Sequence, residues 1–292
     1  MEFNGEKLIL DNFRDVLMEY SVDIQDVVRS AILDDIDITE FIDACADMPY
    51  KLDQIRLSLK EKTKDMCNLP NGEMIYQVRK LKRRGVDIRQ LENQLSNGSL
   101  NEEYINFAIS LIGEGISISS LDIAIIPKTL LETFEYGLRS GIDMKPFNNG
   151  KAYKPKYIRY CLQIIQNNKP VSVFLDGEWS LEVLEVLSVF SKVNDYRWNN
   201  LMNHIDSEIS KVRLDKVVEL VKNNINLDTL QTKESGKYVY ADECLDLVLS
   251  AHVSKLDYEN VILETRDPVE IKQKLNEMEL NRRKKVGGRV TK

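Results

Sequence analysis

A seven-residue pattern of apolar and polar positions recurs along the chain. It consists of any residue, an apolar residue, Asp, Ser or Asn, an apolar residue, two residues of any type and a final apolar residue. The pattern is clearest at residues 85–91, 115–121 and 141–147. Further copies begin at Ser21, Asp35, Asn224 and Lys255. A recurring unit of this kind indicates a repeat architecture.

Weaker copies complete the series. Two drifted copies begin at Pro170 and Asp195, and a degraded copy is expected near 64–67. From Gly85 onward the copies begin 25 to 31 residues apart. This spacing accommodates one helical hairpin in each copy, as in α-solenoids.

Each position of the pattern has a local structural reason. Apolar residues at helical spacing precede it, as Met74, Val78 and Leu81 do before Gly85. Gly or Asn at the first position accepts the left-handed conformation that ends many helices. The Asp, Ser or Asn at the third position can cap a following short helix. The last two apolar residues are three apart and so share a face of that helix.

These features predict an all-α, α-solenoid-like helical repeat in four segments. They are an acidic N-terminal helical cap at 1–48, regular repeats at 49–147, divergent repeats at 151–265, and a C-terminal helix with a basic disordered tail at 266–292. The best candidate for a break between domains is 148–150. Two short β-prone stretches, near 170–177 and 236–240, predict a small β-hairpin or an ordered loop inserted among the helices.

The composition indicates in which compartment the protein is expected. The acidic N-terminus does not resemble a signal peptide, and no apolar run is long enough for a transmembrane helix. The four cysteines are scattered without a paired motif, which is typical of reduced cysteines in a cytoplasmic protein. We therefore expect a cytoplasmic protein with no membrane contact.

Charge is distributed unevenly along the chain. The net charge is −7, residues 1–60 carry 14 acidic and 6 basic side chains, and residues 281–292 carry six basic and no acidic ones. The acidic start and the basic end could attract each other or different partners.

The residues offer little for catalysis. His204 and His252 have no metal-ligand spacing around them, and neither a nucleophile elbow nor a phosphate-binding loop is present. We therefore expect no enzymatic activity, no catalytic residue, no cofactor and no metal site.

Two basic clusters are candidate interaction surfaces. The first extends from Arg79 to Arg89 and ends a predicted helix, where cations also complement the helix dipole. The second interleaves lysines and Arg159 with tyrosines, a combination that can contact nucleic acid. Some of those tyrosines can instead pack against a neighbouring repeat. The residues predicted to contact a partner are Arg79, Lys82, Arg83, Arg84, Arg89, Lys154, Lys156, Tyr157, Arg159, Trp179, Trp198, Arg282, Arg283, Lys284 and Lys285.

Two stretches resemble a known class of repeats. Residues 52–59 read Leu-Asp-Gln-Ile-Arg-Leu-Ser-Leu, and residues 135–143 read Glu-Tyr-Gly-Leu-Arg-Ser-Gly-Ile-Asp. Both are similar to the short helical repeats of mobile-element proteins in Gram-positive bacteria. Ser58 stands where that pattern has the Gly that Gly137 keeps. The resemblance covers residues 50–150 and implies a phage or mobile-element origin, without implying any catalytic residue.

The sequence therefore favours a non-enzymatic protein–protein interaction module. A mobile-element inhibitor or adaptor of a host or defence complex fits the resemblance. A nucleic-acid-binding regulator that uses the basic clusters and the tail is the alternative, and self-association stays open.

Overall fold

The computed structural model describes residues 18–96, 100–230, 242–265 and 267–287, and these residues form helices without any strand. The prediction of an all-α chain is therefore confirmed for this part of the chain. The chain divides into two compact units, residues 1–150 and 151–292, which are treated separately below.

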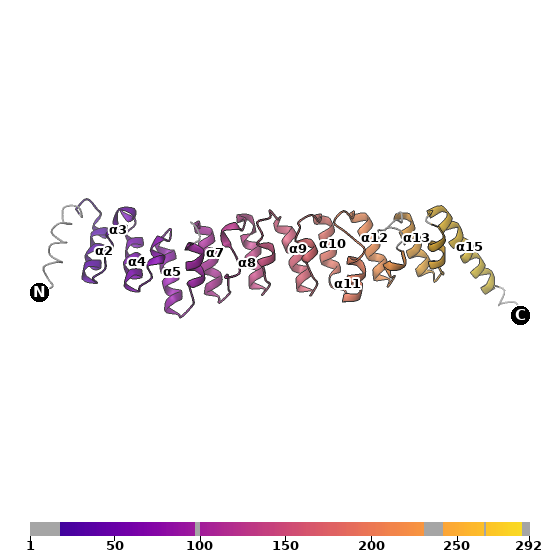
Figure 1. Ribbon diagram of the computed structural model, residues 1–292, viewed down its shortest axis with the longest axis horizontal. Helices are drawn as coiled ribbons and strands as arrows, with labels where there is room; N and C mark the ends of the chain where they lie inside the picture. Colours follow the sequence, from indigo (N-terminus) through magenta and orange to yellow (C-terminus); the bar gives the residue numbers. More distant parts are fainter. Residues whose placement is uncertain (1–17, 97–99, 231–241, 266, 288–292) are drawn as a thin grey trace. The chain divides into compact units, whose positions relative to one another are not determined.

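Within the first unit each long helix packs on the next one along the chain. The successive pairs in contact are α2 with α4, α4 with α5, α5 with α7, and α7 with α8 (Figure 1). The α-helices are α2 (Val22–Leu33), α3 (Thr39–Ile42), α4 (Pro49–Lys60), α5 (Gly72–Arg83), α6 (Arg89–Ser96), α7 (Glu102–Gly113) and α8 (Leu131–Arg139). Short 3-10 helices connect them: η1 (Asp43–Cys45), η2 (Lys64–Asn68), η3 (Ile123–Ile125), η4 (Lys128–Leu130) and η5 (Lys145–Phe147).

The second unit follows the same principle. Its helices pack in sequence, α9 on α10, α10 on α12, α12 on α13, and α13 on α15, with α11 against α12 and α14 against α15. The α-helices are α9 (Pro155–Gln166), α10 (Leu181–Phe190), α11 (Asp195–Met202), α12 (Lys211–Lys222), α13 (Asp242–Val253), α14 (Glu259–Glu264) and α15 (Pro268–Gly287). Two 3-10 helices accompany them, η6 (Ser172–Phe174) and η7 (Leu227–Leu230).

The recurring sequence pattern is a recurring helix end. At Gly85, Gly115 and Gly141 the backbone is left-handed, with φ between 73° and 79°. The next amide donates to a carbonyl five residues back, as Val86 N does to Leu81 O at 3.1 Å. This is the Schellman C-cap. The same arrangement occurs at Asp35, Lys62, Asn168, Asn224 and Lys255.

The remaining positions of the pattern also have the predicted roles. Asp87 Oδ1 accepts the Arg89 amide at 3.0 Å, and Asp143 Oδ1 accepts the Lys145 amide at 3.0 Å. The last two apolar residues of a copy are buried together, as Ile88 and Leu91 are.

Three details differ from the sequence-based expectations. The degraded copy ends α4 at Lys62, slightly before 64–67. The drifted copies do not place Pro170 or Asp195 in the left-handed conformation, because Asn168 takes that role in one and Asn194 caps α11 in the other.

The predicted insertions and tail can be compared with the structure only in part. Around 170–177 the chain forms the single turn η6 in place of a hairpin. The stretch 236–240 lies outside the described residues. Residues 282–287, predicted to belong to a disordered tail, continue α15 in the structure, and residues 288–292 lie outside the described part.

Side-chain amides connect successive copies of the pattern. In each of these amide clamps, one Asn or Gln side chain bonds to backbone groups of a neighbouring copy. Gln94 donates to Leu121 O at 2.7 Å and accepts the Ile123 amide at 3.2 Å. Asn148 and Asn200 form two more amide clamps, on Asp122 and on Ile225 and Leu227 respectively. These contacts fix the register between copies because hydrogen bonds are directional.

Candidate functional site

The first basic cluster lies at the C-terminal end of α5, and its first member is not on the surface. Arg79 is only 2 % exposed. Its guanidinium donates to Gln54 Oε1 at 2.6 Å and forms an ion pair with Glu61 at 2.7 Å. Arg79 therefore joins α5 to α4, and its burial does not fit the predicted contact with a partner.

Two more cations of this cluster are exposed but paired. Arg83 lies 2.5 Å from Glu61, and Arg89 lies 2.6 Å from Asp87. The hydrogen bond from Arg79, together with the one from Arg83, lowers the pKa of Glu61. The hydrogen bonds from Arg89 lower the pKa of Asp87 to about 2. Both carboxylates are therefore charged at neutral pH and neutralise part of the cluster.

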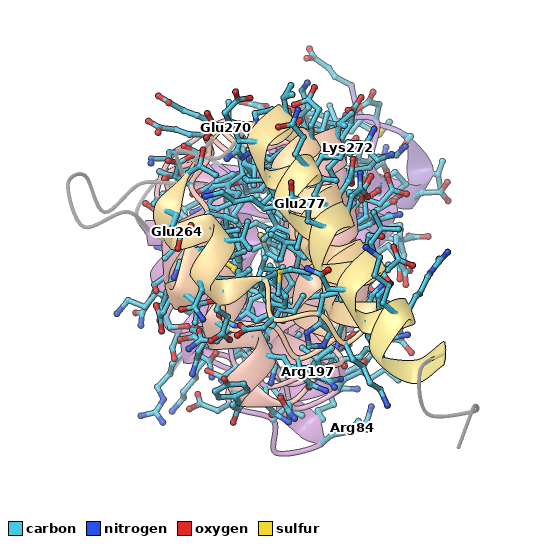
Figure 2. All side chains as sticks on the ribbon, turned by 90° about the vertical axis from the view of Figure 1, so that its right-hand side faces the viewer. Arg84, Arg197, Glu264, Glu270, Lys272 and Glu277 are labelled. Atoms are coloured by element: carbon cyan, nitrogen blue, oxygen red, sulfur yellow. The ribbon has the colours of Figure 1, made fainter. Side chains whose placement is uncertain are left out.

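Lys80, Lys82 and Arg84 form the remaining part, which we call the open cationic patch. All three side chains are exposed. None has an ion-pair partner among the described residues, and Arg84 extends outward from the end of α5 (Figure 2). The structure thus separates the predicted cluster into a structural half and an outward-facing half.

Ion pairs recur between successive copies in the first unit. In each of these ion pairs the base stands two positions before a left-handed residue. Its acidic partner stands one position before the left-handed residue of the preceding copy. Lys60 contacts Asp34 at 2.7 Å. Arg83 contacts Glu61 in the same way, and Arg139 contacts Glu114 at 2.7 Å. We call this series the ion-pair ladder. The hydrogen bond from Lys60 lowers the pKa of Asp34, as expected for a paired carboxylate.

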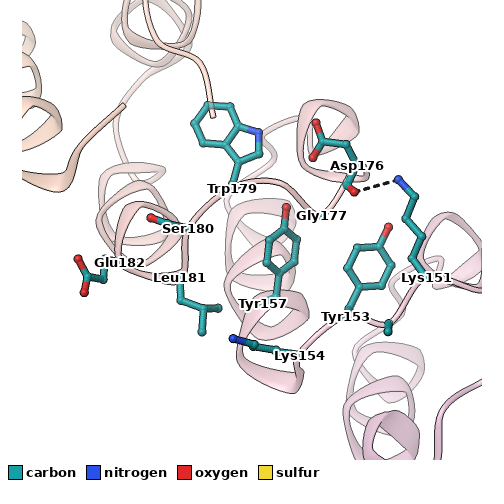
Figure 3. Close-up of a pocket in the computed structure, with 11 residues that line it drawn as sticks. Lys151, Tyr153, Lys154, Tyr157, Asp176, Gly177, Trp179, Ser180, Leu181 and Glu182 are labelled. Carbon is teal, nitrogen blue, oxygen red and sulfur yellow. Dashed lines mark hydrogen bonds between the residues drawn. The ribbon is translucent and has the colours of Figure 1, made fainter. Parts of the chain in front are cut away.

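The second candidate region is an open hollow of about 660 Å³ in the second unit. Tyr153, Tyr157, Trp179, Lys154 and Glu182 are among the residues that line it (Figure 3). The segment between η6 and α10 supplies Asp176 and Gly177.

The aromatic polar atoms of this hollow bond to backbone. Tyr153 Oη donates to Leu175 O at 2.6 Å, and Tyr157 Oη donates to Phe174 O at 2.7 Å. The Trp179 indole N–H donates to Val173 O at 3.0 Å. These three groups therefore hold the turn around η6. Desolvation by burial raises the pKa of Tyr157, so its hydroxyl remains protonated.

Several residues predicted to contact a partner lie inside the second unit. Tyr157, Trp179 and Trp198 are buried, and the Trp198 ring stacks on Phe190 at 6.4 Å. They are packing residues in this structure. Those that remain exposed around α9 are Lys154, Lys156 and Arg159.

The cations of the C-terminal helix differ in their surroundings. Arg282 donates to Ser254 O, Arg283 pairs with Glu279 at 2.5 Å, and Lys284 is exposed. The side chain of Lys285 lies outside the described part. Two of these cations, Arg282 and Arg283, are therefore engaged in contacts within the chain.

The contacts of His204, whose side chain is buried, have no signal in the sequence. The His204 side chain places Nδ1 2.6 Å from Asn200 O and Nε2 2.9 Å from Asp228 Oδ1. Asp228 comes from the next copy, 24 residues along the chain. This histidine therefore connects α11 to η7, much as the Asn200 amide clamp does.

No group of three or more His, Cys, Asp or Glu side chains among the described residues is placed to hold a metal ion. None of the described helices has the length and apolar character needed to cross a bilayer.

Comparisons with known proteins found no matching family model, no similar curated protein and no matching solved structure. The resemblance to mobile-element repeats therefore stays a prediction.

Proposed function

We propose that this chain is a non-enzymatic protein–protein interaction module built as an α-solenoid-like helical repeat. The recurrence of one helix end supports the architecture, because the left-handed residues from Asp35 to Asn168 follow one another at intervals of 23 to 30 residues. Contacts between copies have a similar spacing, such as 27 residues from Asn200 to Leu227. Short-range coupling of this kind is typical of solenoids.

The proposed function rests on which polar side chains make contacts within the chain and which face outward. Potentially reactive side chains such as His204, Tyr157 and Arg79 contact a neighbouring copy or turn. The open cationic patch, in contrast, faces outward without a partner among the described residues. Repeat scaffolds characteristically bind partners through such surfaces.

An affinity experiment tests this function. The purified full chain is immobilised and exposed to a lysate of a Gram-positive bacterium, which the sequence resemblance makes the first source of partners. A captured protein is then purified and mixed with the chain, and the mass of the complex is measured by light scattering. We expect a defined stoichiometric complex. Failure to retain any protein at both low and moderate salt would refute the proposal.

A further inference from the structure

The hollow in the second unit is lined by the connecting segments of two successive copies. One segment, residues 151–154, precedes α9, and the other, residues 176–182, extends from η6 into α10. The volume of the hollow, about 660 Å³, falls within the range of about 300–1,000 Å³ that is typical of ligand sites. The hollow can therefore hold a few side chains of a bound segment.

Hydrogen bonds hold the aromatic residues that line the hollow. The polar atoms of Tyr153, Tyr157 and Trp179 all donate to backbone carbonyls of residues 173–175. Phe174 lies edge-on to the Trp179 ring, with 5.0 Å between the ring centroids. Because their donors are already used, these rings offer an occupant mainly carbon. They are also fixed before anything binds, which lowers the entropic cost of binding.

Two side chains of opposite charge line the same hollow without a charged partner. Lys154 stands immediately before α9, and Glu182 lies in the first turn of α10. Both are exposed, and neither forms an ion pair with the other or with any further residue in the described part of the chain. The other two charged residues of the lining, Lys151 and Asp176, bond to backbone groups next to η6. Lys154 and Glu182 therefore remain available to an occupant.

The position of Lys154 has no explanation within α9. Helices α2, α5, α7, α10, α11 and α12 begin after a Ser or Asn whose side chain accepts a backbone amide. Lys154 stands at the corresponding position of α9 and makes no such bond. Its positive charge also opposes the dipole of the helix that it precedes. A role outside the fold accounts for a lysine at this position.

We infer that this hollow binds a segment of a partner protein in which an apolar residue lies between an acidic and a basic one. This inference rests on the proposed interaction function and gives it a binding site in the second unit. The apolar side chain packs against the aromatic rings, the acidic one pairs with Lys154, and the basic one pairs with Glu182. Nucleic acid is disfavoured as the occupant, because a polyanion in the hollow would meet the carboxylate of Glu182.

Three variants of the full chain separate this site from its surroundings. Lys154→Glu/Glu182→Lys exchanges the two charges and leaves the net charge unchanged. The matched control, Lys156→Glu/Glu185→Lys, makes the same exchange at exposed positions of α9 and α10 that do not line the hollow. Ala152→Trp fills the hollow from an exposed position, so this variant is expected to fold. Circular dichroism verifies that each variant keeps the helix content of the wild-type chain.

The probe is an array of end-blocked seven-residue peptides with a central leucine. Glutamate and lysine occupy the flanking positions in every arrangement, including two residues of the same charge. We expect the wild-type chain to retain peptides that carry one acid and one base, in a preferred order. Lys154→Glu/Glu182→Lys should prefer the reverse order, and the control should keep the wild-type order. The best peptide, labelled for fluorescence anisotropy, should bind Ala152→Trp about 10-fold or more weakly than the wild-type chain.

The possible contrary results are distinct. The inference is overturned if the wild-type chain retains no peptide, if it retains like-charged peptides equally well, or if the preferred order survives the charge exchange. Unchanged affinity of the best peptide for Ala152→Trp would overturn it as well. A partner captured by the wild-type chain that binds Ala152→Trp equally well would leave the interaction function standing and refute this site.

Discussion

Asn200→Ala should be among the most destabilising single changes to a polar side chain in the second unit. Asn200 is 8 % exposed, and its amide donates to Ile225 O and accepts the Leu227 amide, both at 3.0 Å. Truncation leaves these two backbone groups, on nearly fully buried residues, without their partner. An unsatisfied buried polar group costs about 1–3 kcal/mol, so we expect a loss of about 2–4 kcal/mol after partial relaxation.

Two further variants make the reasoning specific. Asn199→Ala changes the exposed neighbour on the same helix and should change the free energy of unfolding by less than about 0.5 kcal/mol. Asn200→Asp keeps an acceptor for the Leu227 amide but buries a carboxylate whose second oxygen faces the Ile225 carbonyl, so its effect should be at least as large as that of Asn200→Ala.

Urea unfolding followed by circular dichroism gives the free energies, and hydrogen exchange reports the Leu227 amide directly. In Asn200→Ala this amide should exchange faster than in the wild-type chain. If Asn200→Ala unfolds within about 0.5 kcal/mol of wild type and the protection of Leu227 is unchanged, the amide clamps do not hold the copies together.

Two further predictions concern the first unit. Gly137→Ala should destabilise the chain by about 1–3 kcal/mol, because a Cβ there would lie 2.3 Å from Met144 Sδ. A double-mutant cycle with Met144→Ala, measured by urea unfolding, should show coupling between the two changes. Additive effects would contradict the predicted clash. Glu61→Gln should reduce the loss of stability in acid, because a carboxylate whose folded-state pKa is lowered stabilises the fold above its unfolded value of about 4.3 and loses that contribution as the pH falls. Thermal unfolding from pH 7 to pH 3 measures this, and equal acid sensitivity of the two proteins would refute it.

The local parts of this fold could be predicted from the sequence because their causes are local. Gly85, with its apolar neighbour Val86 and the cap Asp87, forms a helix end from interactions within a few residues. Lys62 could not be placed in the same way, because Thr63 and Lys64 follow it where the pattern has an apolar residue and then Asp, Ser or Asn. The sequence accordingly predicts that copy slightly too late.

Contacts between copies could not be predicted. The backbone partners of Gln94, Asn148 and Asn200 lie 25 to 29 residues away in sequence, and nothing near these amides distinguishes them from surface residues. The same limit explains the errors at the candidate site. Arg79 and Trp198 read as exposed anchors, but their exposure depends on which residues the neighbouring copy brings against them.

The α5–α7 junction shows why a copy can give up its ladder pair. Apolar stripes hold neighbouring helices together but do not by themselves fix their register, because the hydrophobic effect is non-directional. At this junction Asn71 Nδ2 donates to Glu102 Oε1 at 2.9 Å near the start of the two helices, and Gly113 allows α7 to approach Leu81 near their ends. These contacts fix both ends of the junction without an ion pair. The positions that the ladder would occupy are therefore released from a structural role, and it is there that Arg84 is found.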